Sequence, residues 1–66
     1  MDDEFNMSLR KFLKQVGVTS QQAIEAAIRD AGDAAKGKTL TARMVLTIDG
    51  LPFEHKVEGK ITGPKG

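Results

Sequence analysis

The fold is decided by the stretch Leu40-Thr-Ala-Arg-Met-Val-Leu-Thr-Ile48, Asp49-Gly50-Leu51-Pro52, Phe53-Glu-His-Lys-Val-Glu-Gly-Lys-Ile61. Alternate residues are apolar along its first part and mostly apolar along its last part, and the residues between them are mostly polar or charged. A period of two places each set on its own face of a pleated strand. The stretch therefore predicts an antiparallel hairpin, with strands at about 39–48 and 53–62 and with one apolar face.

Two turn registers fit this hairpin. A two-residue turn at Asp49-Gly50 is the strongest short hairpin signal, and it would place Arg43 opposite Lys56. A four-residue loop that ends at Pro52 would place Arg43 opposite Glu58 instead, where opposite charges attract. Proline has no N–H to give to a strand ladder, so it suits a loop better than a strand. We favour the four-residue loop.

The residues before the hairpin predict two helices. The apolar residues between positions 3 and 16 recur with a 3.6-residue period, which is typical of one buried helix face. Gly17 suits the left-handed residue that ends such a helix. Thr19 and Gln22 form a capping-box pattern at the start of a second helix, at about 20–35. We therefore expect an α+β fold of order ααββ, in which two N-terminal helices pack on a C-terminal antiparallel β-hairpin.

Length and composition limit the kind of protein this is. The chain has 66 residues, so we expect a single domain, 1–66, near the lower end of what folds without support. It has no cysteine and one histidine, so we expect no disulfide, no metal site and no cofactor. Of the usual ways to stabilise so short a chain, self-association is the one that remains. We expect a flexible tail at 63–66.

The first strand offers the better edge for a homodimer that extends the sheet. A two-stranded sheet leaves both edges open, and alternating charges on the polar face of the second strand often keep such an edge from pairing. The first strand carries Arg43 as the only charge on this face. The predicted dimer interface consists of Ala42, Met44, Val45 and Leu46.

The charge balance and the N-terminal residues argue against a nucleic-acid-binding, secreted or membrane protein. Ten basic residues are balanced by nine acidic ones, so no bulk field draws the chain to nucleic acid or to an anionic membrane. The first residues are acidic where a signal peptide would be basic, and no apolar run reaches membrane-spanning length. These features predict a cytoplasmic protein without membrane contact.

His55 is the first candidate for chemistry. Histidine is the residue type most often used for proton transfer in active sites. No serine, cysteine or carboxylate accompanies His55 in a catalytic motif, so we expect a structural role at the rim of the sheet and no enzyme activity.

Residues 12–28 are the second candidate, because they have the outline of a helix-turn-helix. Its reading helix would show Glu25 and would offer Arg29 alone for phosphate contacts, so packing explains the segment better than DNA binding. A basic cluster on the first predicted helix consists of Arg10, Lys11 and Lys14. The chain has no Trp or Tyr to stack on bases, so this cluster is better explained as a solvated helix face.

Two segments carry a family resemblance. Phe5-Asn-Met-Ser-Leu-Arg-Lys-Phe-Leu-Lys-Gln-Val-Gly-Val-Thr-Ser-Gln21, with Glu54-His55 and Val57-Glu58-Gly59, resembles a family of short bacterial proteins known as a domain of unknown function. The resemblance implies a small, stand-alone bacterial protein and transfers no site residues. Our expectation is a structural or interaction module that acts as a homodimer, with an unidentified protein as a further partner. The alternatives are a nucleic-acid-binding regulator and a small-ligand binder with a pocket between helices and sheet.

Overall fold

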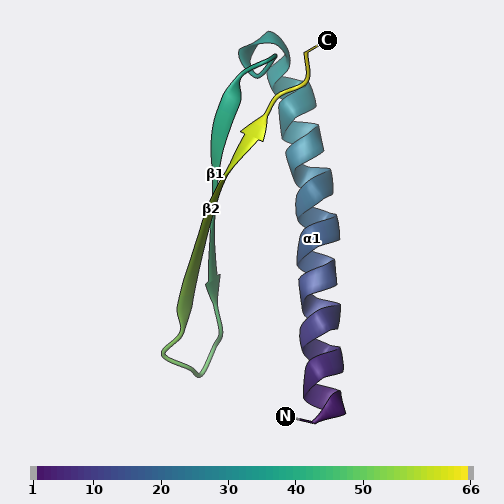
Figure 1. Ribbon diagram of the computed structural model, residues 1–66, viewed down its shortest axis with the longest axis vertical. Helices are drawn as coiled ribbons and strands as arrows, with labels where there is room; N and C mark the ends of the chain where they lie inside the picture. Colours follow the sequence, from purple (N-terminus) through teal and green to yellow (C-terminus); the bar gives the residue numbers. More distant parts are fainter. Residues whose placement is uncertain (1, 66) are drawn as a thin grey trace. The chain divides into compact units, whose positions relative to one another are not determined.

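The computed structural model describes residues 2–65 and contains one long helix followed by one hairpin (Figure 1). Helix α1 spans Asp3–Ala31, the 3₁₀ helix η1 spans Gly32–Ala34, and the strands β1 and β2 span Thr39–Thr47 and Glu54–Thr62. These elements form two compact units, of which the first ends at Ala31 and the second begins at Gly32. The predicted α+β class is confirmed, whereas the two predicted helices are one.

Helix α1 runs through the position where the sequence predicts a turn between helices. Gly17 lies in the helix interior, and nothing lies within 4 Å of the place that a Cβ would take. Thr19 caps no second helix, because its Oγ1 donates to the backbone carbonyl of Gln15, 2.7 Å away and one turn back. The prediction of separate helices at 3–16 and 20–35 is therefore wrong. A glycine costs a helix only about 1 kcal/mol, and the unbroken helix keeps its backbone hydrogen bonds.

The ends of α1 have local causes. At the start, the Oδ1 of Asp2 accepts a hydrogen bond of 2.8 Å from the backbone N–H of Phe5, which is the geometry of an N-terminal cap. Asp3 and Glu4 place negative charge in the first turn, where the helix dipole is positive. At the other end, Gly32 has a φ of 57°, the left-handed conformation that commonly ends helices.

The hairpin has the register of the four-residue loop. Arg43 lies opposite Glu58, and Met44 lies opposite Val57, as predicted. The two strands form a two-stranded antiparallel sheet in the order β1-β2. Attraction across the Arg43–Glu58 pair and the absence of an N–H on Pro52 both favour this register over the shorter turn.

The turn between the strands is built around Gly50 and Pro52. The N–H of Leu51 donates to the carbonyl of Ile48 at 3.2 Å, and Gly50, at the third turn position, has a φ of 88°. A positive φ at this position is type II geometry, which glycine adopts without a Cβ penalty. The N–H of Phe53 then donates across Pro52 to the carbonyl of Leu51 at 2.8 Å, which leaves the proline in the loop.

The strand ends opposite the turn are joined by a second set of backbone contacts. The N–H of Gly63 donates to the carbonyl of Lys38 at 2.8 Å, and the N–H of Gly37 donates to the carbonyl of Pro64 at 2.9 Å. We call this contact the hairpin base; its members are Ala35, Gly37, Lys38, Gly63 and Pro64. Within the predicted flexible tail, residues 63 and 64 are hydrogen-bonded to the two residues that precede β1, and residue 66 lies outside the described residues.

The hairpin base also holds the only buried hydrophobic side chain among residues 2–65. Ala35 is only 2% exposed to solvent, and Gly63 beside it is buried as well. A Cβ on residue 63 would clash with the carbonyl oxygen of Ala35, so this close approach requires glycine. The larger apolar side chains of both units remain exposed or only partly covered.

Candidate interaction surfaces

Helix α1 carries an apolar stripe along its whole length. Its members, which we call the helix stripe, recur at spacings of three, four and four residues: Phe5, Leu9, Leu13, Val16, Ser20, Ile24, Ala27 and Ala31. One repeat of this spacing is eleven residues, which is close to three turns of an α-helix. The stripe therefore rotates around the helix by only about 20° per repeat. The stripe passes Gly17 without a change of phase, which places the residues on both sides of it on one face.

The large members of the helix stripe have no cover within their own unit. Phe5 and Leu13 are 43% and 49% exposed to solvent, and Leu9 and Ile24 are similarly exposed. An amphipathic helix gains most of its stability by packing such a face against another element. The stripe is therefore a candidate surface for contact with a partner.

The hairpin has a second apolar surface, on one face of its two strands. Cross-strand pairs bring together Leu40 and Ile61, and also Met44 and Val57. Met44 and Val57 retain 43% and 50% of their exposure. Two strands with one uncovered apolar face are at best marginally stable in water, so this face also needs cover.

The predicted dimer residues all lie on β1. Ala42, Met44 and Leu46 alternate along the apolar face, and Val45 lies between them on the polar face. β1 pairs with β2 on one side, and in the described sheet its other edge has no strand partner. Unpaired N–H and C=O groups on such an edge can pair with another strand.

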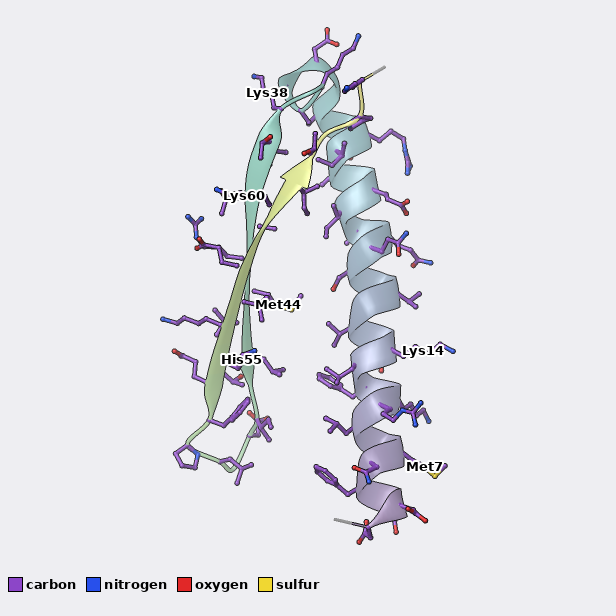
Figure 2. All side chains as sticks on the ribbon, viewed as in Figure 1. Met7, Lys14, Lys38, Met44, His55 and Lys60 are labelled. Carbon is purple, nitrogen blue, oxygen red and sulfur yellow. The ribbon has the colours of Figure 1, made fainter. Side chains whose placement is uncertain are left out.

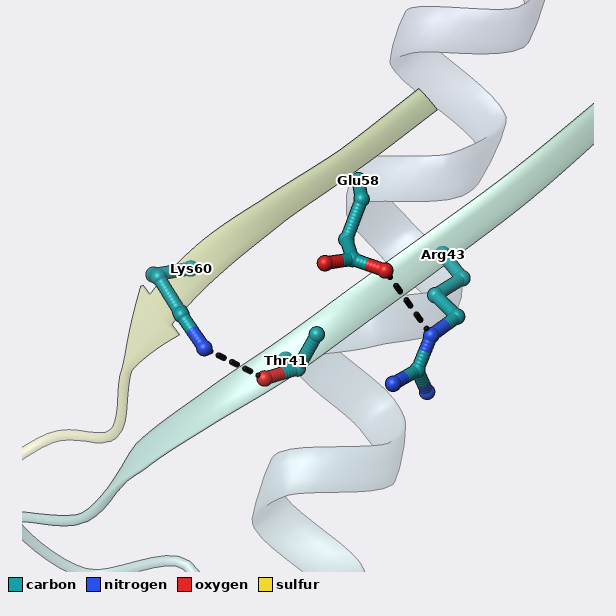
Figure 3. Close-up of polar contacts among 4 residues, drawn as sticks. All are labelled: Thr41, Arg43, Glu58 and Lys60. Atoms are coloured by element: carbon teal, nitrogen blue, oxygen red, sulfur yellow. Dashed lines mark hydrogen bonds and ion pairs between the residues drawn. The ribbon is translucent and has the colours of Figure 1, made fainter. Parts of the chain in front are cut away.

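The polar face of the hairpin is occupied by contacts between its own strands (Figure 3). The Nε of Arg43 donates to the Oε2 of Glu58 at 3.0 Å, and the Nζ of Lys60 donates to the Oγ1 of Thr41 at 2.8 Å. The side chains of the ion pair are 71% and 62% exposed, so solvent screens their attraction. These contacts favour this strand pairing, and they add little to the free energy of unfolding.

The structure places His55 opposite Leu46 on the apolar face, where it is exposed. Figure 2 shows it on the hairpin near Met44. Within residues 2–65 no group of three or more His, Cys, Asp and Glu side chains is arranged to hold a metal ion. The structural role of His55 stays a prediction.

The basic cluster lies on α1, where Arg10, Lys11 and Lys14 line a shallow open depression together with Met7. Met7 and Lys14 lie on the same side of the helix in Figure 2. The helix-turn-helix outline considered as an alternative for 12–28 does not form, because these residues are one continuous helix without a turn. A helix-turn-helix reads DNA by setting its second helix at an angle to the first, and this segment has no such second helix.

Two parts of these surfaces were not anticipated from the sequence. The first is the unbroken helix stripe, and its signal was the constant phase of Val16, Ser20 and Ile24 across Gly17. The second is the hairpin base, for which a Gly-Pro sequence after a strand gives no distinctive signal.

Comparison with known protein families gives a match. The model of a family described as a family of unknown function (DUF6494) covers residues 1–64. No curated protein and no solved structure matches the chain. In the described part of the chain, no helix combines the length and the apolar character that crossing a membrane requires.

Proposed function

We propose that this chain, a member of the DUF6494 family of unknown function, is a small interaction module that works as a non-catalytic homodimer. One observation carries the proposal: the apolar faces of both units are exposed, and Ala35 is the only buried hydrophobic residue among those described. Ordering a chain costs roughly 1.5 kcal/mol per residue, and burial has to offset this cost. A partner that covers both faces supplies the missing burial.

A second copy of the chain fits this requirement. The formal net charge is +1, so two copies repel each other only weakly. The open edge of β1 pairs with its own copy across a two-fold axis, which gives a four-stranded antiparallel sheet and satisfies the edge backbone groups. β2 suits this contact less, because Glu54, Lys56, Glu58 and Lys60 line its polar face.

The side chains of β1 favour a two-fold axis at Met44. An axis at Arg43 would set two arginines directly opposite each other, which is unfavourable. An axis at Met44 sets Arg43 opposite Val45 of the second copy and Ala42 opposite Leu46. A small side chain then meets a larger one on the apolar face, and the arginines are separated. This register uses all four residues predicted for the interface.

Sedimentation equilibrium over a dilution series tests the proposal. The wild-type chain should be dimeric at low micromolar concentration. Met44→Glu places two carboxylates face to face at the axis and should raise the dimer dissociation constant at least tenfold, which is about 1.4 kcal/mol. Val57→Glu is the matched control, because residue 57 lies on the same face and is similarly exposed but belongs to β2.

Two outcomes would contradict the proposal. A wild-type chain that is a folded monomer at low micromolar concentration would exclude the homodimer. A dimer that is weakened equally by Met44→Glu and Val57→Glu would exclude β1 as its edge. Circular dichroism on each variant shows whether helix and strand content are retained, so that loss of the dimer is separated from loss of the fold.

A further inference from the structure

We infer that the two copies also pair their α1 helices antiparallel along the helix stripe, so that bulky residues of one copy pack against small residues of the other. This inference rests on the proposed homodimer and deepens it by naming a second contact surface. The occupant of the stripe is thus the stripe of a second copy. Two properties of α1 support the antiparallel direction, its size gradient and its charge distribution, and its exposed area fits a dimer contact.

The helix stripe is bulky in its first half and small in its second. Phe5, Leu9 and Leu13 precede its midpoint, and Ser20, Ala27 and Ala31 follow it, with Ile24 as the larger exception. If Val16 of one copy lies opposite Ser20 of the other, Phe5 lies opposite Ala31 and Leu9 lies opposite Ala27. In the two outer layers at each end of the pair a large side chain then faces a small one, and nearer the middle Leu13 lies beside Ile24 of the other copy.

A parallel pair would not pack in this way. It would set Phe5 against Phe5 at one end and Ala31 against Ala31 at the other, so the helices would diverge toward the first end or leave voids at the second. Interiors that pack at the density of proteins contain few such voids. The size gradient therefore favours the antiparallel direction.

The charges of α1 favour the same direction. The part of the helix up to Gly17 carries three basic and two acidic side chains, whereas the part after it carries two acidic side chains and one basic one. Antiparallel pairing sets the net positive half of each copy against the net negative half of the other. It also opposes the two helix dipoles. Both effects are modest and screened by salt, and they act in addition to the packing.

The exposed area of the stripe is consistent with one part of a dimer interface. Phe5, Leu9, Leu13 and Ile24 retain 39% to 49% of their exposure. A fully exposed side chain of this size has about 200 Å² of accessible surface, so each of the four exposes about 80 Å². Two copies together expose about 600 Å² of stripe surface. Specific interfaces bury about 1,200–2,000 Å² in total, so the helix pair supplies a substantial part and the β1 edge another. Both contacts are antiparallel, so each is compatible with two-fold symmetry.

Disulfide trapping tests the direction of the helices, because the chain has no cysteine of its own. Leu9→Cys and Ala27→Cys are made as separate variants, unfolded together, refolded as a mixture and equilibrated in a glutathione redox buffer. Antiparallel pairing brings residue 9 of one copy next to residue 27 of the other, so the mixture should form the mixed disulfide.

Each variant alone should stay reduced. In the antiparallel pair the two copies of residue 9 are offset by 18 residues, about 27 Å along the axis, and a disulfide needs Cα atoms within about 7 Å. We expect at least tenfold more 9–27 disulfide in the mixture than self-disulfide in either variant alone. Val18→Cys is the control, since residue 18 lies on the helix side away from the stripe and should not cross-link.

Other outcomes separate this inference from the proposed function. A self-disulfide of Ala27→Cys alone would show parallel helices and overturn the inference, while the homodimer would stand. A dimer in sedimentation that gives no disulfide in the mixture would also overturn it, because the stripes would not be in contact. A wild-type chain that sediments as a folded monomer would overturn both.

Discussion

Replacing Gly63 with alanine should open the hairpin base. The added Cβ would clash with the carbonyl oxygen of Ala35 and would lie 2.9 Å from the carbonyl carbon of the same residue. Both atoms belong to the backbone, so no side-chain rotation relieves the clash. Residue 63 has to move away from residue 35, and this movement breaks the backbone hydrogen bonds that join Gly63 to Lys38 and Gly37 to Pro64.

The expected destabilisation follows from the contacts that are lost. Two backbone hydrogen bonds contribute about 1 kcal/mol each. Exposure of the Ala35 methyl group adds about 0.8 kcal/mol, so the free energy of unfolding should fall by about 2–3 kcal/mol. Gly59→Ala, in the strand that precedes Gly63, is the matched control, because nothing lies within 4 Å of its Cβ position. A strand glycine replaced by alanine with free space should change stability by less than about 1 kcal/mol, and in the favourable direction.

Urea unfolding and hydrogen exchange measure the effect together. Far-UV circular dichroism gives the midpoint, with all variants at one protein concentration because the stability of a dimer depends on concentration. Amide exchange at residues 37 and 63 reports on the hairpin base itself, where a loss of about 2 kcal/mol corresponds to roughly 30-fold faster exchange. The reasoning would be refuted if Gly63→Ala kept the wild-type midpoint and both amides kept their protection.

Two further substitutions have defined expectations. The Arg43–Glu58 pair is exposed, so a double-mutant cycle with alanine at both positions should give a coupling energy below about 1 kcal/mol, and a larger value would show that the pair is shielded from solvent. Gly17→Ala should raise the free energy of unfolding by about 0.5–1 kcal/mol, since the residue is helical and has free space, whereas Ala26→Gly should lower it by a similar amount. Thermal melts compare these two variants with the wild type, and an unchanged or lower melting temperature for Gly17→Ala would mean that the helix is broken at this position.

The register of the hairpin was predictable because its causes are local. Arg43 has one acidic partner in the longer register and a basic one in the shorter, and Pro52 belongs in a loop. Both facts can be read from residue types and a count of positions. The shared face of Ala42, Met44 and Leu46 has the same origin, since alternation alone places them together. Their role in a dimer interface stays a prediction.

The continuity of α1 was misjudged because local signals and longer-range periodicity disagree around Gly17. Glycine, Thr19 and Gln22 together match the end of one helix and the start of the next. The structure shows that the threonine hydroxyl is bonded within the helix instead, to the carbonyl of Gln15. The even spacing of the helix stripe across this point was the better guide, because it depends on eight positions rather than three.

The hairpin base could not be predicted, because it depends on a close approach of two backbone segments. Ala35 lies after the helix, and Gly63 lies after the last strand, so no repeat within one element relates the two residues. A glycine near the end of a sequence more often marks a loose tail than a packed contact. The requirement for glycine at position 63 becomes visible only when the carbonyl of Ala35 is in place beside it.

The hairpin base also bears on the rates at which the second unit folds and opens. It joins the first and last residues of the hairpin sequence, whereas the pairs next to the Gly50 turn are separated by few residues. Closing a long loop costs more entropy than closing a short one, so pairing that starts at the turn brings the hairpin base together last. A contact formed after the transition state slows unfolding and leaves the folding rate almost unchanged. The hairpin base thus determines how long the hairpin stays closed, and the turn determines how fast it forms.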